Sequence, residues 1–414
     1  MKQVLTLMVM LLASMANYSV QAFDRLVGAD LSMVPAYEAA GDRWLDENGN
    51  AISDIVQYVQ SKGWNAVRVR VFVDPSQDSG DPAVCQDLNY AVALGKRVKQ
   101  AGMALLVDLH YSDTWSDPGQ QRIPASWTDR TDEALATQLE TYTREVMNAF
   151  VAAGAAPDYV QTGNEITYGQ LWPTGHIWPG GGGQDGGSWG NFTAYLEQAI
   201  KACKEECPEA KIVIHTEMSK ATNVTNFYSN LKSYPNISYD IIGLSYYPEY
   251  HGTVSALEGV IRSLEAAYSD KEIMIVETGH GIQWHIINGN DSGYELTEAG
   301  QKQFATDLIT MLNNHPKVTG LYWWYPEDNG NGVKYKDDWI TWWNAALFNH
   351  STGKPYAAFY ELKTFRGVES GMETLSAATI QTDKDAPMYN VAGQKVNSNY
   401  KGIVITNGKK KVVK

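Results

Sequence analysis

The sequence predicts a (β/α)8 TIM barrel of the α/β class, with long loops after its strands and a small β appendage at its C-terminal end. Eight short apolar runs alternate with longer amphipathic segments between residues 27 and 326, which is the pattern of eight βα units. Polar residues gather at the C-terminal ends of several runs, where such barrels carry their functional sites. No Gly-rich phosphate turn follows an early run, which disfavours an open doubly wound sheet.

The predicted elements follow in order along the chain. The strands, rich in β-branched and aromatic residues, cover residues 27–32, 65–72, 104–111, 159–165, 211–217, 241–247, 272–278 and 320–326. Helices are predicted where apolar residues recur at helical spacing, at 52–62, 89–101, 133–153 and 194–206. A run of four glycines at 180–183 lacks the lysine of a phosphate-binding loop, so it predicts a flexible loop at the rim of the barrel.

Three segments are expected. Residues 1–22 have a basic start, an apolar run and small residues at the end, which is typical of a secretory signal peptide. Residues 23–368 form the barrel domain, and residues 369–414 form a small C-terminal β module or tail. Stretches at 388–396 and 401–409 predict short strands joined by turns, and this segment resembles the C-terminal β modules of sorting-domain type on some exported bacterial proteins. Its basic end, from Lys409 onward, is expected to be a solvated terminus.

Charge and composition restrict the partners. The formal net charge is −14, which argues against nucleic acid and anionic membranes and favours a neutral polysaccharide or oligosaccharide. The chain has 13 Trp and 24 Tyr against 9 Phe, and rings with a polar edge suit stacking on sugars. No later segment has the length of a transmembrane helix, so we expect an exported monomer in the periplasm, at the cell surface or secreted. Cys85, Cys203 and Cys207 cannot all pair, so buried thiols or one local disulfide are expected.

Two glutamates end apolar runs, Glu165 the fourth and Glu277 the seventh. Glutamate is a poor strand residue, so packing alone seldom explains a carboxylate there. If both runs belong to one barrel, the acids share its rim, and their repulsion raises the pKa of one of them. Such a pair is the minimal equipment for cleaving a glycosidic bond. In a retaining enzyme one acid protonates the leaving oxygen and the other attacks the anomeric carbon, across about 5–5.5 Å.

Other polar residues on these strands have structural as well as functional interpretations. Arg68 and Asp108 could form an ion pair inside the barrel, and Glu217 could be a partner for an arginine. A metal-dependent hydrolase would use Asp108, His110, His215 and Glu217, although such a site usually has more than two histidines nearby.

Neighbours of the two glutamates could serve the same chemistry. Asn164, directly before Glu165, could hydrogen-bond a sugar 2-hydroxyl. Arg70 and Tyr247 could hold the nucleophile ionised and oriented, because donors and cations favour a charged carboxylate.

Longer segments carry a specific resemblance. They read GADLS at 28–32, VRVRVF at 67–72, DLHYSDTWSDPGQQ at 108–121, QTGNEI at 161–166 and IGLSYYP at 242–248. Together with the glutamate that ends the seventh run, they are similar to glycoside hydrolase family 53, the endo-β-1,4-galactanases. The resemblance covers about residues 27–350 and keeps the order of the family.

The resemblance implies a site and a substrate. Glu165 would be the acid/base and Glu277 the nucleophile, with no cofactor required for catalysis. The cleaved-bond subsite would be lined by Asp30, Arg70, His110, Asn164 and Tyr247, with Trp324 as its floor. Neighbouring sugar subsites would use Tyr111, Trp115, Asp117, Trp172 and Trp343. The substrates would be β-1,4-galactans, such as the galactan and arabinogalactan side chains of pectin.

The chain departs from the family in one motif. After the eighth strand the family usually has Tyr-Trp-Glu-Pro, whereas this chain has Trp-Trp-Tyr-Pro at 323–326, so a rim carboxylate is missing. Some bacterial members bind a structural calcium between the loops after the seventh and eighth strands. The oxygen-bearing side chains that could hold such an ion here are Asn288, Asn290, Asp291 and Asp328.

Two alternatives stay open. One is another endo-glycanase of the same clan, acting on a neutral β-glycan such as mannan or xylan, because the glutamate pair is common to the clan. The other is a non-catalytic galactan-binding protein. Only the longer motifs favour cleavage of galactan, so the prediction of the substrate depends on these motifs and not on the glutamate pair.

Overall fold

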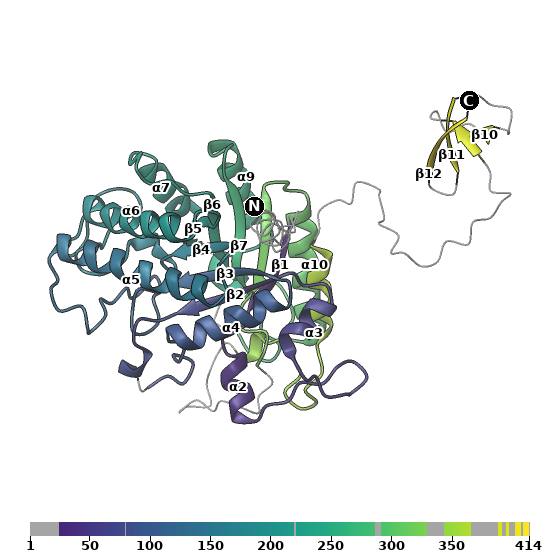
Figure 1. Ribbon diagram of the computed structural model, residues 1–414, viewed down its shortest axis with the longest axis horizontal. Coiled ribbons are helices and arrows are strands. Elements are labelled where there is room, and N and C mark those ends of the chain that lie inside the picture. The colour runs from purple at the N-terminus through teal and green to yellow at the C-terminus, as the bar shows by residue number, and fades with distance from the viewer. Residues whose placement is uncertain are drawn as a thin grey trace, which may run out of the picture. The chain divides into compact units, whose positions relative to one another are not determined.

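The computed structural model describes residues 25–365, except 79, 219–220, 286–290 and 329–342, together with four short strands between residues 388 and 413 (Figure 1). The chain divides into two compact units, Met1–Val368 and Glu369–Lys414, and each is described by itself. The signal peptide predicted at residues 1–22 lies outside the described residues. Among the helices of the described part, none has the length and apolar character needed to cross a membrane.

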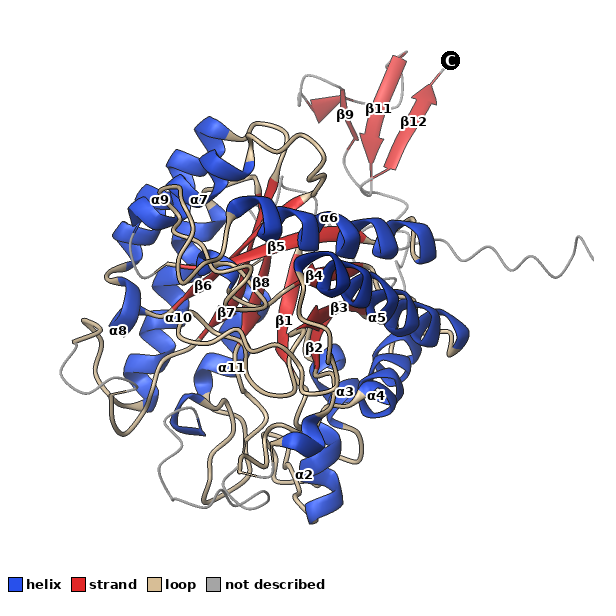
Figure 2. Cartoon of the chain, turned by 90° about the vertical axis from the view of Figure 1, so that its left-hand side faces the viewer, coloured by secondary structure: helices blue, strands red, loops and turns tan. Residues whose placement is uncertain are grey.

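The larger unit is built around a closed barrel of eight parallel strands in chain order, in which β8 pairs back to β1. The strands are β1 (Leu26–Asp30), β2 (Ala66–Val71), β3 (Ala104–Leu109), β4 (Tyr159–Thr162), β5 (Lys211–Glu217), β6 (Ile241–Tyr246), β7 (Glu272–Thr278) and β8 (Val318–Trp323). Helices lie between consecutive strands along the chain and surround the barrel (Figure 2). The predicted (β/α)8 barrel is confirmed.

The described helices are α2 (Val34–Ala40), α3 (Ile55–Ser61), α4 (Leu88–Gln100), α5 (Asp132–Ala152), α6 (Trp189–Glu206), α7 (Ala221–Leu231), α8 (Pro248–His251), α9 (Val254–Ala267), α10 (Glu298–Asn313) and α11 (Ala357–Glu361). Short 3-10 helices are η1 (Pro75–Gln77), η2 (Ile166–Tyr168), η3 (Trp343–Ala345) and η4 (Leu362–Thr364). The helices predicted at 52–62, 89–101 and 133–153 correspond to α3, α4 and α5. Helix α6 begins at Trp189 rather than at residue 194, because Ser188 Oγ accepts the Asn191 N–H at 3.0 Å and caps the helix there.

Apolar side chains fill the lower part of the barrel and polar side chains fill the upper part. The lower cluster is fully buried and consists of Leu26, Ala66, Ala104, Leu106, Val213, Ile241, Met274, Val276 and Tyr322. A larger cluster packs the outside of the barrel against the helices, and Cys203 and Cys207 belong to it as buried free thiols. Higher in the barrel, Arg68 is in register with Asp30 on β1. Charged groups therefore enter the interior at the C-terminal ends of the strands, which places the site there.

An irregularity in β7 aims Glu277 into the barrel. Leu244 of β6 pairs with Ile275, but the next residue, Ser245, pairs with Glu277. Val276 is the extra residue of this bulge, and it lies in the apolar cluster inside the barrel. Side chains alternate between the two faces of a regular strand, so a regular β7 would send Glu277 outward after Val276. The bulge turns the carboxyl toward the interior.

Six strands end earlier than predicted, and left-handed backbone follows three of them. Beyond β3, β4 and β8, Tyr111, Glu165 and Tyr325 have φ values of 51°, 46° and 61°. Such values are uncommon for residues other than glycine and cluster at functional sites. The prediction that Glu165 closes the fourth strand is therefore wrong, because it stands in the turn after β4.

The smaller unit contains a four-stranded sheet in the order β10-β9-β11-β12. The strands are β9 (Met388–Asn390), β10 (Lys395–Val396), β11 (Gly402–Thr406) and β12 (Lys409–Val413). Both stretches predicted to form strands do so. Lys409 to Lys411 of the basic end belong to β12 and pair antiparallel with β11.

Candidate active site

A cavity of about 570 Å³ lies at the C-terminal end of the barrel. Its lining comes from the loops after β2 and β3 and from the ends of β4 to β8. The lining residues are Asp81, Ala83, Trp115, Ser116, Asp117, Pro118, Asn164, Glu165, Glu217, Tyr247, Tyr250, His251, Glu277, Trp324 and Tyr325. Acids and aromatic rings dominate this set, and both predicted glutamates belong to it.

Glu165 is held by the turn that follows β4. Gly163 has a φ of 111°, and a Cβ on it would come within 2.6 Å of Gln170 Oε1, so the turn requires glycine at this position. The Glu165 N–H donates to His215 Nδ1 at 3.2 Å. The Ser245 side chain acts to lower the pKa of the Glu165 carboxyl, against the effect of burial. The turn thus fixes the backbone of Glu165.

Glu277 is held by a guanidinium on β2 and by a hydroxyl donor from the residue after β6. Arg68 Nη2 lies 2.9 Å from Glu277 Oε1, and the Tyr247 hydroxyl donates to Glu277 Oε2 at 3.0 Å. Tyr247 makes the contact expected of it. The expected arginine is wrong, because Arg70 Nη1 pairs with Asp30 Oδ1 at 2.8 Å, and Arg68 is the residue that reaches β7.

The two carboxyls differ in their charge environment. Burial and the Glu277 carboxylate raise the pKa of Glu165 well above its usual range, and the Ser245 side chain opposes this rise. Burial also raises the pKa of Glu277, to about 7, but the Arg68 guanidinium acts against it. A proton shared by the pair therefore resides on Glu165, and Glu277 is the ionised partner.

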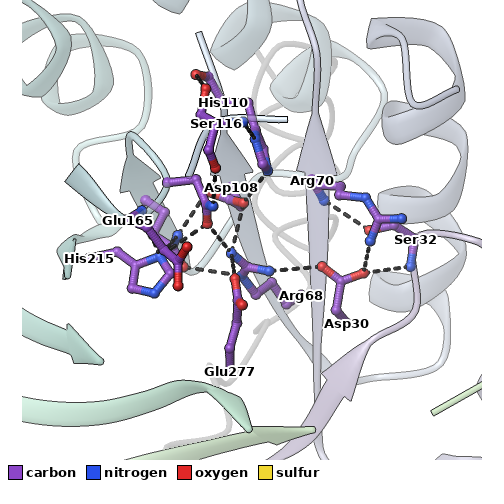
Figure 3. A network of polar contacts seen from close by, with 12 residues as sticks. Asp30, Ser32, Arg68, Arg70, Asp108, His110, Ser116, Glu165, His215 and Glu277 are labelled. Carbon is purple, nitrogen blue, oxygen red and sulfur yellow. Dashed lines mark hydrogen bonds and ion pairs between the residues drawn. The ribbon is translucent and has the colours of Figure 1, made fainter. Parts of the chain in front are cut away.

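Arg68 is the centre of a buried polar network beneath the cavity (Figure 3). Its guanidinium lies 3.0 Å from Asp30 Oδ2 and 2.8 Å from Asp108 Oδ2, which confirms the expected ion pair with Asp108. It also donates to Asn164 Oδ1 at 2.8 Å. Burying these charges costs several kcal/mol per ion unless they are paired and hydrogen-bonded. The network joins β1, β2, β3 and β7 to the turn that carries Glu165.

Asp30, Arg70 and His110 lie in the layer below the cavity and are absent from its lining. All three are buried, because β1, β2 and β3 place them one step deeper than the strand ends. The Arg70 guanidinium lies 4.9 Å and 5.1 Å from the ring centres of Trp115 and Trp324. It therefore supports from below the rings that line the cavity.

His110 acts in the same layer. Its Nε2 lies 3.0 Å from Asp108 Oδ2, and its Nδ1 accepts the Ser116 N–H at 3.0 Å. Ser116 lines the cavity, so His110 orients the loop after β3 rather than facing the cavity itself.

Five of the implied sugar-contacting residues do line the cavity. They are Trp115, Asp117, Asn164, Tyr247 and Trp324. The rings of Trp115 and Trp324 meet edge to face at 5.9 Å, and Trp115 Nε1 donates to Asp81 Oδ2 at 2.7 Å. Together they form an aromatic corner of fixed geometry.

Three further residues have other positions. Tyr111 is buried, and its hydroxyl hydrogen-bonds Thr143 Oγ1 on α5 at 2.9 Å, so its side chain packs toward the helix layer. Trp172 lines an adjoining cavity of about 510 Å³ that shares Asp117 with the main one. Trp343 begins η3, and its side chain lies outside the described residues.

Tyr325 lines the cavity where the family usually has a glutamate. The nearest acid along the chain, Glu327, is fully buried, and its Oε1 accepts the Met33 N–H at 2.9 Å. Glu327 therefore does not replace the missing rim carboxylate.

The residues considered for calcium are only partly described. Asn288 and Asn290 lie outside the described residues. Asp291 Oδ1 accepts the Gly293 N–H at 2.8 Å, and Asp328 Oδ2 accepts the Tyr37 hydroxyl at 2.9 Å. Within the described ranges, no three or more His, Cys, Asp or Glu residues are grouped so that they could hold a metal.

Several residues of the site are not predictable from the sequence. For Arg68 the sequence predicts only an ion pair, because it does not tell which of two arginines on one face reaches the seventh strand. Ser245 stood in the noted IGLSYYP segment, but its register with Glu277 depends on the bulge. Glu217 lines the cavity, and His251 Nε2 lies 3.7 Å from its Oε2.

Comparisons with known proteins agree over most of the barrel unit. Residues 26–361 match the model of glycosyl hydrolase family 53. A probable arabinogalactan endo-β-1,4-galactanase A of Neosartorya fischeri is 34% identical over 316 residues, which cover 72% of this chain and 83% of the relative. An arabinogalactan endo-β-1,4-galactanase of Thermothelomyces thermophilus is 32% identical over 311 residues, which cover 72% of this chain and 88% of the relative.

Solved structures give the same result. A family 53 catalytic domain from Ignisphaera aggregans superposes with a TM-score of 0.73 at 30% identity, covering 84% of this chain and 98% of that one. A structure described with two fungal β-1,4-galactanases superposes with a TM-score of 0.70 at 29% identity. The match covers 82% of this chain and 98% of that one. A family 10 protein from Paenibacillus barcinonensis, at 15% identity and a TM-score of 0.53, shares the fold alone.

Proposed function

The chain belongs to glycosyl hydrolase family 53, and we propose that it is a retaining endo-β-1,4-galactanase with Glu165 as acid/base and Glu277 as nucleophile. The observation that carries the proposal is the asymmetry of the two carboxyls in one cavity. Glu277 has Arg68 at 2.9 Å and the Tyr247 hydroxyl at 3.0 Å, which favour its ionised form. Glu165 has acids around it and a pKa raised well above the usual range, which favours its protonated form.

In the first step the Glu277 carboxylate attacks the anomeric carbon of the sugar. The bond to the glycosidic oxygen breaks, and that oxygen takes the proton of Glu165. The products are a glycosyl ester on Glu277 and a shortened chain with a free hydroxyl group.

In the second step a water molecule gives a proton to the Glu165 carboxylate and attacks the anomeric carbon, which releases Glu277. The ester removes the charge of Glu277, so the repulsion that raised the pKa of Glu165 falls when a base is needed. Two displacements at one carbon restore the original anomeric configuration.

The lining residues fit a sugar chain. Asn164 Nδ2 donates to Ser116 O at 2.7 Å, and the amide carries a second N–H that we assign to the sugar 2-hydroxyl. The rings of Trp115 and Trp324 offer stacking surfaces. Trp172 in the adjoining cavity would serve a more distant sugar, which suits attack within a chain.

The substrate follows from the relatives. The two curated relatives above are named as arabinogalactan endo-β-1,4-galactanases, so we assign β-1,4-galactan, as in pectic galactan and arabinogalactan side chains. The acidic chain, with a formal net charge of −14, suits a neutral polymer. We also propose that residues 1–22 direct export and that the enzyme acts as a monomer outside the cytoplasm.

The catalytic roles are tested by Glu165→Gln and Glu277→Gln. Each should lower kcat on galactan by at least about 10³-fold while the circular dichroism spectrum and the thermal midpoint stay close to those of the wild type. Glu327→Gln is the matched control, since it changes a buried glutamate outside the cavity. Activity near the wild-type level in either Glu165→Gln or Glu277→Gln would overturn the assignment.

The substrate is tested by initial rates on linear β-1,4-galactan, mannan and xylan at equal mass concentrations. We expect cleavage of galactan into oligosaccharides of several lengths at early times, which marks endo action. Faster cleavage of mannan or xylan would replace galactan as the substrate, and binding of galactan without cleavage would indicate a binding protein.

A further inference from the structure

Glu217 and His251 line the cavity of about 570 Å³, and the two-carboxylate reaction gives neither of them a role. Glu217 ends β5 and is only 2% exposed. His251 ends α8, the short helix after β6. His251 Nε2 lies 3.7 Å from Glu217 Oε2, which is beyond the range of a direct hydrogen bond. A carboxyl group and an imidazole ring therefore stand side by side in the cavity wall.

The hydrogen bond at Nδ1 determines which nitrogen of His251 carries the proton. The Tyr247 N–H donates to His251 Nδ1 at 3.0 Å, so Nδ1 is an acceptor. Burial lowers the pKa of His251 to about 3, so above this pH the ring is neutral and carries one proton. That proton is on Nε2. The cavity wall thus presents an N–H donor and a carboxyl acceptor, 3.7 Å apart.

Strand register places Glu217 in the same layer as the nucleophile. Glu217 pairs with Ser245 of β6, and Ser245 pairs with Glu277 of β7, so two strand spacings, roughly 10 Å, separate the two glutamates. His215 precedes Glu217 by two residues on β5 and projects from the same face. Its Nδ1 accepts the Glu165 N–H at 3.2 Å. Glu217 is therefore on the Glu165 side of the nucleophile.

This side of the cavity belongs to the leaving sugar. Glu165 gives its proton to the leaving oxygen, so the sugar that departs extends from Glu277 toward Glu165. Trp324, which follows β8, is on the opposite side of Glu277, where its N–H donates to the carbonyl oxygen at the end of β7 at 2.7 Å. The retained sugar therefore lies toward Trp324, and the leaving sugar lies toward β5 and β6, which carry the acceptor and the donor.

An exposed aromatic ring lies beside the donor and the acceptor. Tyr250 lines the same cavity and is 47% exposed. The centre of its ring lies 5.9 Å from that of His251. A tyrosine ring combines an apolar face with a polar edge, which suits stacking on a sugar. This part of the cavity offers a sugar both an apolar surface and hydrogen-bonding groups, a combination typical of ligand sites.

We propose that Glu217 and His251 together bind one hydroxyl group of the leaving sugar, which donates to a Glu217 carboxyl oxygen and accepts from the His251 Nε2–H. A hydroxyl group is a donor and an acceptor at once, so it can bridge two groups that are too far apart to bond each other. A carboxyl group accepts several hydrogen bonds, so Glu217 can bind the hydroxyl beside its other contacts. The inference rests on the proposed function and deepens it, because it assigns the subsite of the leaving sugar.

The test measures which molecule attacks the glycosyl ester on Glu277. The donor 4-nitrophenyl β-1,4-galactobioside forms this ester without a sugar in the leaving-group subsite. Water or added β-1,4-galactobiose then attacks the anomeric carbon through a hydroxyl oxygen, gives the hydroxyl proton to the Glu165 carboxylate and releases Glu277. Both routes use the same base, so the ratio of transfer to hydrolysis reports how well the leaving-group subsite binds a sugar.

Glu217→Leu should lower this ratio by about 10- to 100-fold, as expected for the loss of a hydrogen bond to a charged group. Glu217→Gln removes the same charge but keeps an oxygen acceptor, so its loss should be smaller. His251→Asn keeps an acceptor for the Tyr247 N–H and loses the Nε2 donor, so the ratio should fall by about 3- to 10-fold. The matched control is Glu327→Gln, which changes a buried glutamate outside the cavity lining and should leave the ratio as in the wild type.

Three results would overturn the hydroxyl-binding role. They are an unchanged ratio in Glu217→Leu, equal losses in Glu217→Leu and Glu217→Gln, and a wild-type enzyme that hydrolyses the donor without any transfer. If Glu217→Leu does not fold, Glu217→Gln and His251→Asn provide the same test against Glu327→Gln.

A second measurement does not need activity. Calorimetric titration with β-1,4-galactotetraose should show weaker binding by Glu217→Leu than by the wild type and Glu327→Gln. If the donor and galactan are not cleaved but binding weakens in this way, the proposed function fails and the hydroxyl-binding role stands. Equal binding by Glu217→Leu and the wild type, or no binding by the wild type, would overturn that role.

Discussion

Glu165 and Glu277 carry the same carboxyl group, and their neighbours make them different. Arg68 and Tyr247 contact the Glu277 carboxyl, whereas a backbone turn holds Glu165. Cations and donors stabilise a carboxylate, and neighbouring acids destabilise it. The assignment of acid and nucleophile therefore depends on these few contacts more than on the positions of the glutamates along the chain.

Tyr247→Phe tests the environment of Glu277. The tyrosine hydroxyl lowers the pKa of that carboxyl, so its removal should raise the pKa, and Glu277 will be protonated at higher pH than in the wild type. The acid limb of kcat/KM should move upward by about one pH unit, with lower activity below neutral pH.

The control for this change is Tyr246→Phe. The neighbouring tyrosine is also buried, but its hydroxyl donates to Gly252 O at 2.9 Å, away from the carboxyl pair. Its acid limb should match that of the wild type. An unmoved limb in Tyr247→Phe would show that this hydrogen bond does not set the ionisation of Glu277.

Individual site residues could be predicted from the sequence only in part. Glu165, Glu277, Asn164 and Tyr247 stand next to the ends of apolar runs, so their place at the rim follows from strand periodicity and the barrel rule. The choice between Arg68 and Arg70 could not be predicted, because two arginines on one strand face differ only in depth and side-chain path.

Two local backbone features of the barrel position the carboxyls. The bulge at Val276 turns Glu277 inward, and the left-handed turn at Gly163 and Glu165 brings the second acid over the strand ends. Bulges and left-handed residues cost energy and are kept where they aim a functional group. The sequence predicts eight strands and their order, but neither a bulge nor a left-handed turn has a periodic signal, so β3, β4 and β8 end before their predicted last residues.

Gly163→Ala tests the turn after β4. A methyl group there would lie 2.6 Å from Gln170 Oε1 and 2.7 Å from Ile166 Cγ2, so the backbone before Asn164 and Glu165 has to move. We expect kcat/KM to fall by roughly 10- to 100-fold, the scale of a small misplacement of a reacting group, together with a loss of stability of about 1 kcal/mol or more.

Gly154→Ala separates strain from misplacement. Gly154 also has a positive φ, 71°, but its methyl group would have nothing within 4 Å. This variant should lose stability without losing kcat/KM. Equal kinetic losses in both variants, at equal folded fraction, would contradict the role of the Gly163 turn.

The whole barrel is polarised along its axis, with an apolar lower part and a charged upper part. The eight-unit pattern made this architecture predictable from the sequence, because strands and helices have distinct periods. The depth at which Asp30, Arg70 and His110 sit was not predictable, since it depends on strand register and closure. The second unit, Glu369–Lys414, contains a sheet of its own.

Glu327, a buried carboxyl in the segment that follows β8, should make the stability of the fold depend on pH. Burial raises the pKa of Glu327 to about 8, and Asp30 adds to the rise. A carboxyl with a folded-state pKa above its unfolded value stabilises the fold fully below the unfolded pKa, and this contribution is lost as pH rises through about 8. Glu327→Gln keeps an acceptor for the Met33 N–H and removes the titration.

The measurement is the thermal midpoint of both proteins at about pH 5 and about pH 8.5. The midpoint of Glu327→Gln relative to the wild type should be higher at the alkaline pH than at the acid pH. A difference in thermal midpoint between the two proteins that is the same at both pH values would show that Glu327 does not titrate in this range.

The central claim is that this chain cleaves β-1,4-galactan by two displacements at the Glu165 and Glu277 pair. The most direct measurement is time-resolved proton NMR of linear β-1,4-galactan during digestion by the wild-type enzyme. For a retaining enzyme we expect the β-anomer of the new reducing ends to appear first and the α-anomer to grow in later by mutarotation. First appearance of the α-anomer would contradict the retaining mechanism, and the absence of new reducing ends would contradict the proposed function itself.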